Sequence, residues 1–201
     1  MQQKLFLPPN GNFLPFQGEV HFYEKFFVQK EADQFFKFLI DQVPWKQEPI
    51  WMFGKKVMQP RLTALYGDPK VAYSYSGIEM KALNWIQPLV EIRKRIESLV
   101  SINFTHVLLN YYRTGQDSMG WHRDNEASLG KNPCIASVSF GATRNFQLRH
   151  YESKSNKLTI PLHHGSLLIM AGESQHYWEH QIPKTKRDPG PRINLTFRKL
   201  I

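Results

Sequence analysis

Residues 192–198 read Arg-Ile-Asn-Leu-Thr-Phe-Arg, with apolar and polar side chains in strict alternation. This alternation predicts a β-strand, because successive side chains of a strand point to opposite faces of its sheet. Ile193, Leu195 and Phe197 would share the face turned toward a core. The other face carries two arginines and an asparagine, which fit either a solvated strand surface or a pocket for a dicarboxylate. The alternation alone leaves both interpretations open.

The chain before this strand has the same character from residue 105 onward. Short runs rich in β-branched and aromatic residues follow one another, separated by Gly, Pro, Asn and Asp. The runs span residues 105–112, 135–140, 144–150, 157–163, 165–170, 176–182 and 192–200. Even spacing of such runs is typical of an all-β sandwich or barrel. We therefore predict a β jelly roll in the C-terminal half.

Two amphipathic helices are predicted in the N-terminal half. Residues 31–43 place apolar side chains, among them Leu39, at helical spacing. Pro88 is expected to open a second helix whose apolar stripe includes Ile92 and Ile96. Both stripes are expected to pack against the sheet, so the predicted fold class is α+β, mainly β.

The length and composition bound the class of protein. The 201 residues, 41% of them hydrophobic, fit one domain with a sizeable core. Cys134 is the only cysteine, which excludes an internal disulfide and a zinc finger and suits a reducing compartment. No apolar run reaches the roughly 18 residues that a membrane span needs. Residues 1–9 are too short and too broken by Pro for a secretory signal. We expect a monomer without a membrane partner, in the cytoplasm, or in the nucleus of a eukaryotic source.

The charge balance favours a polyanionic partner. Lys and Arg total 26 against 17 Asp and Glu, a formal net charge of +9. A positive field of this size attracts phosphate backbones, because neutralising them releases counterions. Many basic proteins bind no nucleic acid, so the charge alone does not identify the partner.

A His-x-Asp pair at His122 and Asp124 is the first sign of metal chemistry. In an extended segment, residues i and i+2 point to the same side, so the two side chains would converge. His180, in the run 176–182, would complete a set of two imidazoles and one carboxylate. This set is typical of non-haem iron(II) oxygenases, because it leaves coordination positions open. His176 lies in the same run, and alternation does not decide between it and His180.

The order of the motifs is more specific than any one of them. Asn110 and Tyr112, spaced by two, can add neutral hydrogen bonds from a strand facing residues 192–198. Asn-x-Tyr is followed by His-x-Asp, then a distal His, then Arg-x-Asn-x-x-x-Arg. This order resembles the AlkB family of iron(II)- and 2-oxoglutarate-dependent dioxygenases, most of all the branch that repairs double-stranded DNA. The resemblance covers roughly residues 51–201 and is supported by the stretches 51–55, 73–77, 135–141 and 163–168.

The resemblance implies a site and an activity. His122, Asp124 and His180 would bind Fe(II), since the family's distal His stands just before an apolar-Pro pair, here Ile182 and Pro183. The 2-oxoglutarate carboxylates would be bound by Arg192 and Arg198, assisted by Asn110, Tyr112 and Asn194. With O₂ as the second cosubstrate, the enzyme would oxidatively demethylate bases such as 1-methyladenine and 3-methylcytosine in DNA, releasing formaldehyde, succinate and CO₂. This is direct-reversal DNA repair.

The resemblance also implies how the chain is organised. Residues 1–201 would form a single catalytic domain. Residues 105–201 would form a double-stranded β-helix (jelly-roll) core, and residues 1–104 an N-terminal extension with a nucleotide-recognition hairpin lobe. The target base must be flipped out of a duplex, because its Watson–Crick edge is unreachable inside the stack.

The expected contacts to DNA follow from that lobe and from the basic loops. Phe53, at a predicted hairpin tip, would wedge into the base stack. Tyr75, with Tyr73 in the same stretch, would stack on the extruded base, and Glu126 would accept a hydrogen bond from its exocyclic amine. Phosphate contacts are expected from Lys55, Lys56, Arg61, Lys184, Lys186 and Arg187. Duplex DNA is the favoured partner, with single-stranded DNA or RNA as alternatives.

Three rival interpretations keep parts of this pattern. A 2-oxoglutarate oxygenase acting on protein or a small molecule would share the metal site but not the basic hairpin. A non-catalytic nucleic acid-binding module would not require every ligand position to be present, as it is here. A structural zinc site would close with four protein ligands, often thiolates.

Overall fold

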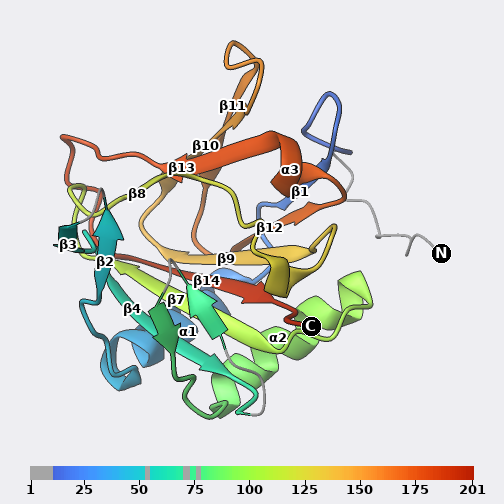
Figure 1. Ribbon diagram of the computed structural model, residues 1–201. Helices are drawn as coiled ribbons and strands as arrows, with labels where there is room; N and C mark the ends of the chain where they lie inside the picture. The colour runs from blue at the N-terminus through green and yellow to red at the C-terminus, as the bar shows by residue number, and fades with distance from the viewer. Residues whose placement is uncertain (1–10, 53–54, 70–72, 76–77) are drawn as a thin grey trace.

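The structure is a computed structural model that describes residues 11–52, 55–69, 73–75 and 78–201, although not the side chains of residues 50–52, 56, 73–75 and 78–80. Two antiparallel sheets form the body of the molecule (Figure 1). The larger sheet has the order β1 (Glu19–Tyr23), β12 (Ser166–Ala171), β9 (Ile135–Gly141), β14 (Arg192–Arg198), β7 (His106–Tyr112) and β4 (Leu62–Gly67). The smaller has the order β11 (Lys157–Leu162), β10 (Arg144–His150), β13 (Trp178–Ile182) and β8 (Met119–His122). The predicted mainly β class, with a core of two antiparallel sheets, is confirmed.

Two helices cover the face of the larger sheet that is turned away from the smaller one (Figure 1). They are α1 (Gln29–Gln42) and α2 (Gln87–Val100), and Pro88 lies in the first turn of α2 as expected. Leu39 of α1 and Ile92 and Ile96 of α2 are fully buried in one cluster with the apolar side chains of β14. The bracing role predicted for both helices is therefore confirmed.

A second apolar cluster lies between the two sheets. It contains Phe146 and Leu162 from the smaller sheet, and Tyr112 and Met170 from the larger one. The apolar side chains of β14 join the first cluster, and its polar side chains point to the opposite face, toward the space between the sheets. The strand is central and both of its faces are covered. All seven residues of β14 are buried, so the interpretation of its polar face as a solvated surface is wrong.

Strands from the N-terminal half also enter the larger sheet. β1 pairs with β12 and β4 pairs with β7, so this sheet extends across the boundary expected at residue 105. Two further hairpins stand outside both sheets, β2 (Pro49–Met52) with β3 (Lys55–Met58) and β5 (Tyr73–Tyr75) with β6 (Ile78–Met80). The first confirms the hairpin predicted around residue 53, while Phe53 itself lies outside the described residues.

Candidate metal and cosubstrate site

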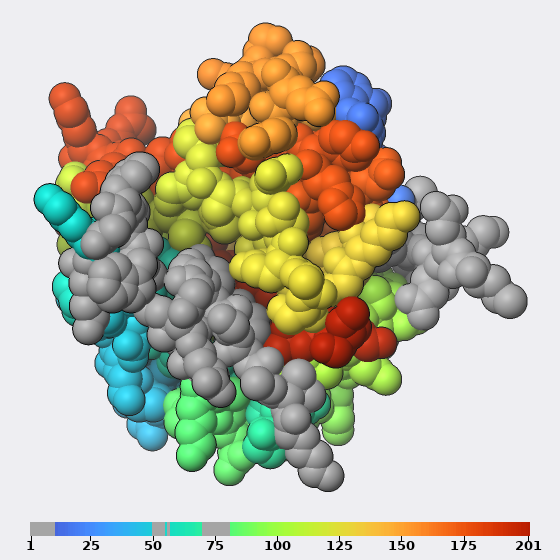
Figure 2. Space-filling model, viewed as in Figure 1, coloured from blue at the N-terminus to red at the C-terminus, as the bar shows by residue number. Residues whose placement is uncertain are grey.

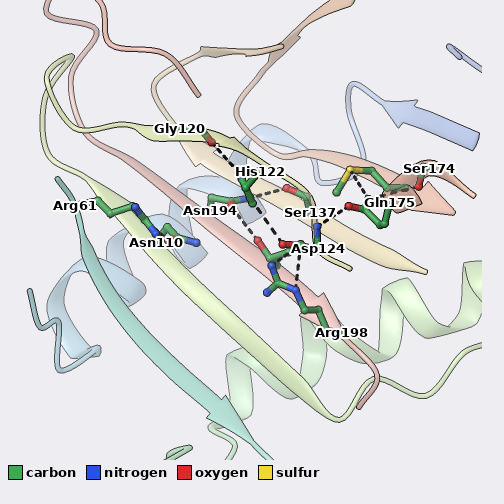
Figure 3. Close-up of polar contacts among 12 residues, drawn as sticks. Arg61, Asn110, Gly120, His122, Asp124, Ser137, Ser174, Gln175, Asn194 and Arg198 are labelled. Carbon is green, nitrogen blue, oxygen red and sulfur yellow. Dashed lines mark hydrogen bonds and ion pairs between the residues drawn. The ribbon is translucent and has the colours of Figure 1, made fainter. Parts of the chain in front are cut away.

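Two histidines face each other across the smaller sheet. His180 on β13 is paired directly with His122 at the end of β8, and their ring centroids are 4.2 Å apart. The Nδ1–H of His122 donates to the Gly120 carbonyl at 2.8 Å, which leaves Nε2 as the free ligand atom (Figure 3). Strand pairing thus brings together two side chains far apart in the sequence.

Asp124 lies just beyond β8 and completes the group. One ligand atom from each of His122, Asp124 and His180 lies within 4.8 Å of the others. The Oδ1 atom of Asp124 is 3.8 Å from Nε2 of His122. Its other oxygen, Oδ2, accepts hydrogen bonds from Arg198 at 2.6 Å from Nη2 and 3.2 Å from Nε (Figure 3). One carboxylate oxygen is therefore paired, and the other faces the imidazoles.

Burial and charge put His180 and Asp124 in the protonation states that a metal requires. Burial, followed by the nearby His122, lowers the pKa of His180 to about 3, so the imidazole is neutral and can ligate. Burial alone would raise the pKa of Asp124, but Arg198 and the two imidazoles outweigh it and hold that pKa well below its usual range. His180 thus offers a neutral imidazole and Asp124 a carboxylate to a metal ion.

Gln175 fixes the backbone of the metal-binding segment, a role that the sequence did not reveal. Its Oε1 accepts the backbone N–H of Asp124 at 2.9 Å, and its Nε2 donates to the Met170 sulfur at 3.3 Å (Figure 3). Gln175 is fully buried in α3 (Ser174–Tyr177), the helical turn that leads into β13. The segment that supplies His180 thus also holds Asp124.

The expectation that His176 and His180 share one strand face is wrong. Residues 174–177 are helical, so His176 turns away from the other two histidines. Its Nε2 contacts the Lys131 carbonyl and the Asn132 side chain, and its carbonyl accepts from Arg123 at 2.7 Å. His176 holds neighbouring loops together, and His180 is the histidine that meets His122 and Asp124.

Arg192 lies at the other end of the same cavity and is nearly unpaired. It is 1% exposed; its Nη2 donates to the Ser139 hydroxyl at 2.9 Å, whereas Nε and Nη1 have no hydrogen-bond partner among the described residues. Burial lowers its pKa to about 10, so it remains cationic at neutral pH. A buried cation with two unsatisfied donors is costly unless an anion fills the space.

Two of the predicted helpers of Arg192 and Arg198 lie on β7, the strand next to β14, and the third lies on β14 itself. Tyr112 pairs with Arg192 and Asn110 pairs with Asn194 in the β7–β14 register. The Nδ2 of Asn194 donates to the Ser137 hydroxyl at 2.7 Å, and its Oδ1 accepts from Thr196 at 3.0 Å. Asn194 therefore stiffens the floor of the cavity through β9.

Arg61 is a correction to the expected phosphate contacts. It is 3% exposed, and its Nε donates to the Asn110 side-chain oxygen at 2.6 Å (Figure 3). A guanidinium buried this way cannot reach a phosphate backbone at the surface. It instead turns the Asn110 amide group so that the nitrogen is the atom left to donate into the cavity.

One cavity contains the metal-ligand group and the arginines. The polar side chains of β14 line it, together with apolar side chains from both sheets. The apolar members are Met119, Phe146, Leu162, Met170 and Ile182. A space of this kind can hold a small dicarboxylate beside a metal ion and shield both from water.

The other expected substrate residues are placed as follows. Lys55, Lys184, Lys186 and Arg187 are exposed. The connection 183–191, which carries three of them, projects at the left of Figures 1 and 2. Glu126 is half-buried, its Oε2 has no partner among the described residues, and burial followed by Asp124 raises its pKa. The side chains of Lys56, Tyr73 and Tyr75, like all of Phe53, lie outside the described part of the chain.

Two imidazoles and a carboxylate lie between two antiparallel sheets, near a buried arginine with two donors that have no partner among the described residues. This arrangement defines a non-haem iron site with a carboxylate-binding neighbour. Consistent with this, the family model described as 2OG-Fe(II) oxygenase superfamily matches residues 19–198. The solved structure of OsALKBH1 superposes with a TM-score of 0.66 at 18% identity, covering 90% of this chain and 97% of that one. That likeness shows the fold.

Curated relatives give the family within this superfamily. The mouse "Alpha-ketoglutarate-dependent dioxygenase alkB homolog 3" is 43% identical over 190 residues, which cover 90% of this chain and 66% of the relative. The human "DNA oxidative demethylase ALKBH2" is 38% identical over 189 residues, which cover 89% and 72%. The chain belongs to the AlkB family of 2OG-Fe(II) oxygenases. It spans just under two thirds of the length of the mouse relative.

The cofactors of this family, Fe(II) and 2-oxoglutarate, fit the residues present. His122, Asp124 and His180 offer the ligands, and the unsatisfied donors of Arg192 suit a carboxylate. Within the described residues, no helix combines the length and apolar character needed to cross a membrane.

Proposed function

We propose that this protein oxidatively removes N-linked alkyl groups from nucleic acid bases such as 1-methyladenine and 3-methylcytosine, with DNA as the substrate and duplex DNA favoured. The observation that carries the proposal is one cavity that holds the His122, Asp124 and His180 group together with Arg192, two of whose donors have no partner among the described residues. The relatives named for 2-oxoglutarate dependence and for DNA demethylation support the same activity.

When bound, Fe(II) with 2-oxoglutarate and O₂ supplies the oxidation of the alkyl carbon, which leaves as formaldehyde while succinate and CO₂ are released. The chain's own residues orient the reactants. Arg192 binds the distal carboxylate with Tyr112 beside it, and Asn110 donates from its amide nitrogen. Arg198 holds Asp124 in its ligating position. No side chain is required as an acid or base at the reacting carbon, so positioning is the protein's main contribution.

We propose that the base enters from the side of His122 and Glu126. Glu126 lies two residues beyond Asp124, half-buried, with an unpartnered carboxylate oxygen. Such an oxygen can accept a hydrogen bond from the exocyclic amine of adenine or cytosine. Tyr73 and Tyr75, on the separate hairpin of β5 and β6, are proposed to stack on the extruded base.

The preference for duplex rests on Phe53 and the basic surface. In the β2–β3 hairpin, Met52 is paired with Lys55, and Phe53 follows Met52 in the sequence. An aromatic side chain there can occupy the gap left by a flipped nucleotide. Lys55 and Lys56 next to it, and Lys184, Lys186 and Arg187 on the connection 183–191, are proposed phosphate contacts.

The test is a mass measurement on a 1-methyladenine oligonucleotide, in single-stranded and duplex form. Protein loaded anaerobically with Fe(II) and 2-oxoglutarate is exposed to air, and H122A serves as the control. The expected result is loss of one CH₂ unit from the oligonucleotide, faster in the duplex, and no loss with H122A. Turnover of 2-oxoglutarate to succinate with both oligonucleotides unchanged would retain the oxygenase and reject the nucleic acid substrate.

The duplex preference has its own test in F53A. The expected result is a large loss of activity on duplex, with activity on the single strand kept to within about threefold, because only the duplex leaves a gap to fill. Equal losses on both forms would reject the wedge while leaving demethylation intact.

A further inference from the structure

The connection between β13 and β14, residues 183–191, follows a fixed course over the turn between β7 and β8. The backbone N–H of Thr185 donates to the Gly115 carbonyl at 2.9 Å. At its far end, the N–H of Ala142 donates to the Pro191 carbonyl at 2.9 Å. The exposed cations Lys184, Lys186 and Arg187 therefore project from an anchored segment.

Arg144 makes the strongest of these anchors. It is the first residue of β10 and is 4% exposed. Its guanidinium donates to three backbone carbonyls: Thr114 at 3.2 Å and Asp117 at 3.0 Å on the β7–β8 turn, and Pro183 at 2.7 Å on the connection. Hydrogen bonds from a buried charged donor are stronger than neutral ones, and the planar fork of Arg suits several fixed acceptors at once.

Gly115 shows independently how closely the two segments approach. A Cβ atom built at Gly115 would lie 2.3 Å from the Arg187 carbonyl oxygen and 2.6 Å from that of Thr185. Both neighbours are backbone atoms, so a side chain at this position would force the connection away from the turn. The contact requires a residue without a Cβ.

The same arginine adjoins the cosubstrate end of the cavity. The ring of Tyr112 lies near both guanidinium groups, with its centroid 5.7 Å from Cζ of Arg144 and 5.1 Å from Cζ of Arg192. Arg144 thus joins the floor of the pocket to the connection that carries the surface cations.

We infer that Arg144 is a positioning residue that fixes the connection 183–191, and with it Lys184, Lys186 and Arg187, for a nucleic acid backbone passing the pocket. The inference rests on the proposed function, which assigns these cations to phosphates. Cations held in place before binding lose less conformational entropy when they meet a ligand. We call the three hydrogen bonds of Arg144, with the close contact at Gly115, the latch. The latch contributes to substrate affinity without touching the substrate.

The test uses two variants. R144M removes all three hydrogen bonds, and G115A places a methyl group on the β7–β8 turn that pushes the connection 183–191 away. R95M is the matched control, because Arg95 also donates to a backbone carbonyl, that of Phe26 at 2.9 Å, but lies exposed on α2. Hydrogen exchange of the Thr185 amide reports the latch, and exchange of the β7 and β14 amides reports global stability. Affinity for the 1-methyladenine oligonucleotide, measured at several salt concentrations, reports how many phosphates the cations neutralise.

In R144M and G115A we expect Thr185 to exchange at least about tenfold faster, with β7 and β14 unchanged. We expect oligonucleotide affinity to fall several-fold with a shallower dependence on salt, because fewer phosphates are neutralised. Binding of Mn(II) as the metal probe should stay close to wild type.

Two results would overturn the inference. Unchanged exchange at Thr185 in both variants would show that the latch does not hold the connection. Faster exchange with unchanged oligonucleotide affinity would show that holding it does not serve binding. Failure of the wild-type protein to bind any oligonucleotide would instead reject the proposed function, and with it the purpose inferred for the latch.

Discussion

Arg198 donates both Nη2 and Nε to one oxygen of Asp124, at 2.6 and 3.2 Å, and leaves the other oxygen facing His122. Both residues are buried, at 4% and 2% exposure, so the pair is shielded from competing water. The resemblance to the family assigned Arg198 to the cosubstrate. In the structure its contact is with the metal-ligand carboxylate, which gives it a direct influence on metal binding.

Replacing Arg198 with Lys should weaken metal binding. Lysine keeps the charge but cannot supply two donors in a fixed geometry, so Asp124 would lose its orientation. Partners of this kind are typically worth about 10–100-fold in metal affinity. Calorimetric titration with Mn(II) measures the change. R149K is the control, since Arg149 pairs with Glu179 on the outer face of the smaller sheet. Wild-type Mn(II) affinity in R198K would contradict the assignment.

Replacing Arg192 with Met should stabilise the empty protein and abolish its response to 2-oxoglutarate. The pKa of Arg192 is lower in the folded protein than in the unfolded chain, so its charge costs folding free energy at neutral pH, and this cost diminishes only as the pH rises above about 10 toward the ordinary pKa of an arginine. Removing two unsatisfied buried donors should add about 1–3 kcal/mol to the free energy of unfolding.

Urea unfolding with and without 2-oxoglutarate checks both parts of this prediction. The wild-type protein should gain stability from the ligand and R192M should not, because binding to the folded state alone stabilises it. If R192M is instead less stable than the wild-type protein without ligand, Arg192 stabilises the empty fold and the prediction is wrong.

Replacing Gln175 with Leu should cost both stability and metal affinity. The Asp124 N–H would be left buried without an acceptor, at a cost of about 1–3 kcal/mol. Because the backbone at Asp124 is then less fixed, Mn(II) affinity should also fall. Q147L is the control, since it removes the glutamine hydrogen bond to Gln181 between β10 and β13 and touches no metal ligand. Equal losses of stability and of Mn(II) affinity in Q175L and Q147L would show that Gln175 does not position Asp124.

Cys134 should be nearly inert to alkylation in the native state. Burial, with a smaller effect from Glu19, raises the pKa of its thiol to about 12. At pH 8 its thiolate fraction is then on the order of a thousandfold below that of an ordinary cysteine. Iodoacetamide labelling followed by mass spectrometry, in native buffer and in guanidinium chloride, measures the ratio. Native labelling within tenfold of the unfolded rate would contradict the prediction.

The sequence was informative wherever a feature depends on local periodicity. The alternation in residues 192–198 and the apolar stripe of residues 31–43 predicted β14 and α1 closely, because neighbouring residues decide which faces are buried. The resemblance to a family, rather than spacing, selected His180 over His176. Spacing failed there because a helical turn interrupts the run just before β13.

Contacts between a side chain and a distant backbone could not be predicted. Gln175 bonds to the Asp124 N–H, and Arg144 to three carbonyls on two loops, and neither contact leaves a pattern in the chain. Arg61 was misassigned for the same reason: its charge suggested the surface, whereas a partner 49 positions away at Asn110 holds it inside. A polar residue's partners are decided by sheet order, which single-strand periodicity does not encode.

The two faces of β14 have different tasks: one packs in the core, and the other faces the cosubstrate cavity. Its apolar side chains pack with α1 and α2, while its polar side chains line the cavity. The surroundings of Arg192 can therefore be changed, for instance to accept a shorter or longer acid in place of 2-oxoglutarate, while Arg198 is kept to hold Asp124 and the helix-facing residues preserve the scaffold. The strand offers a natural site for changing cosubstrate choice by directed evolution.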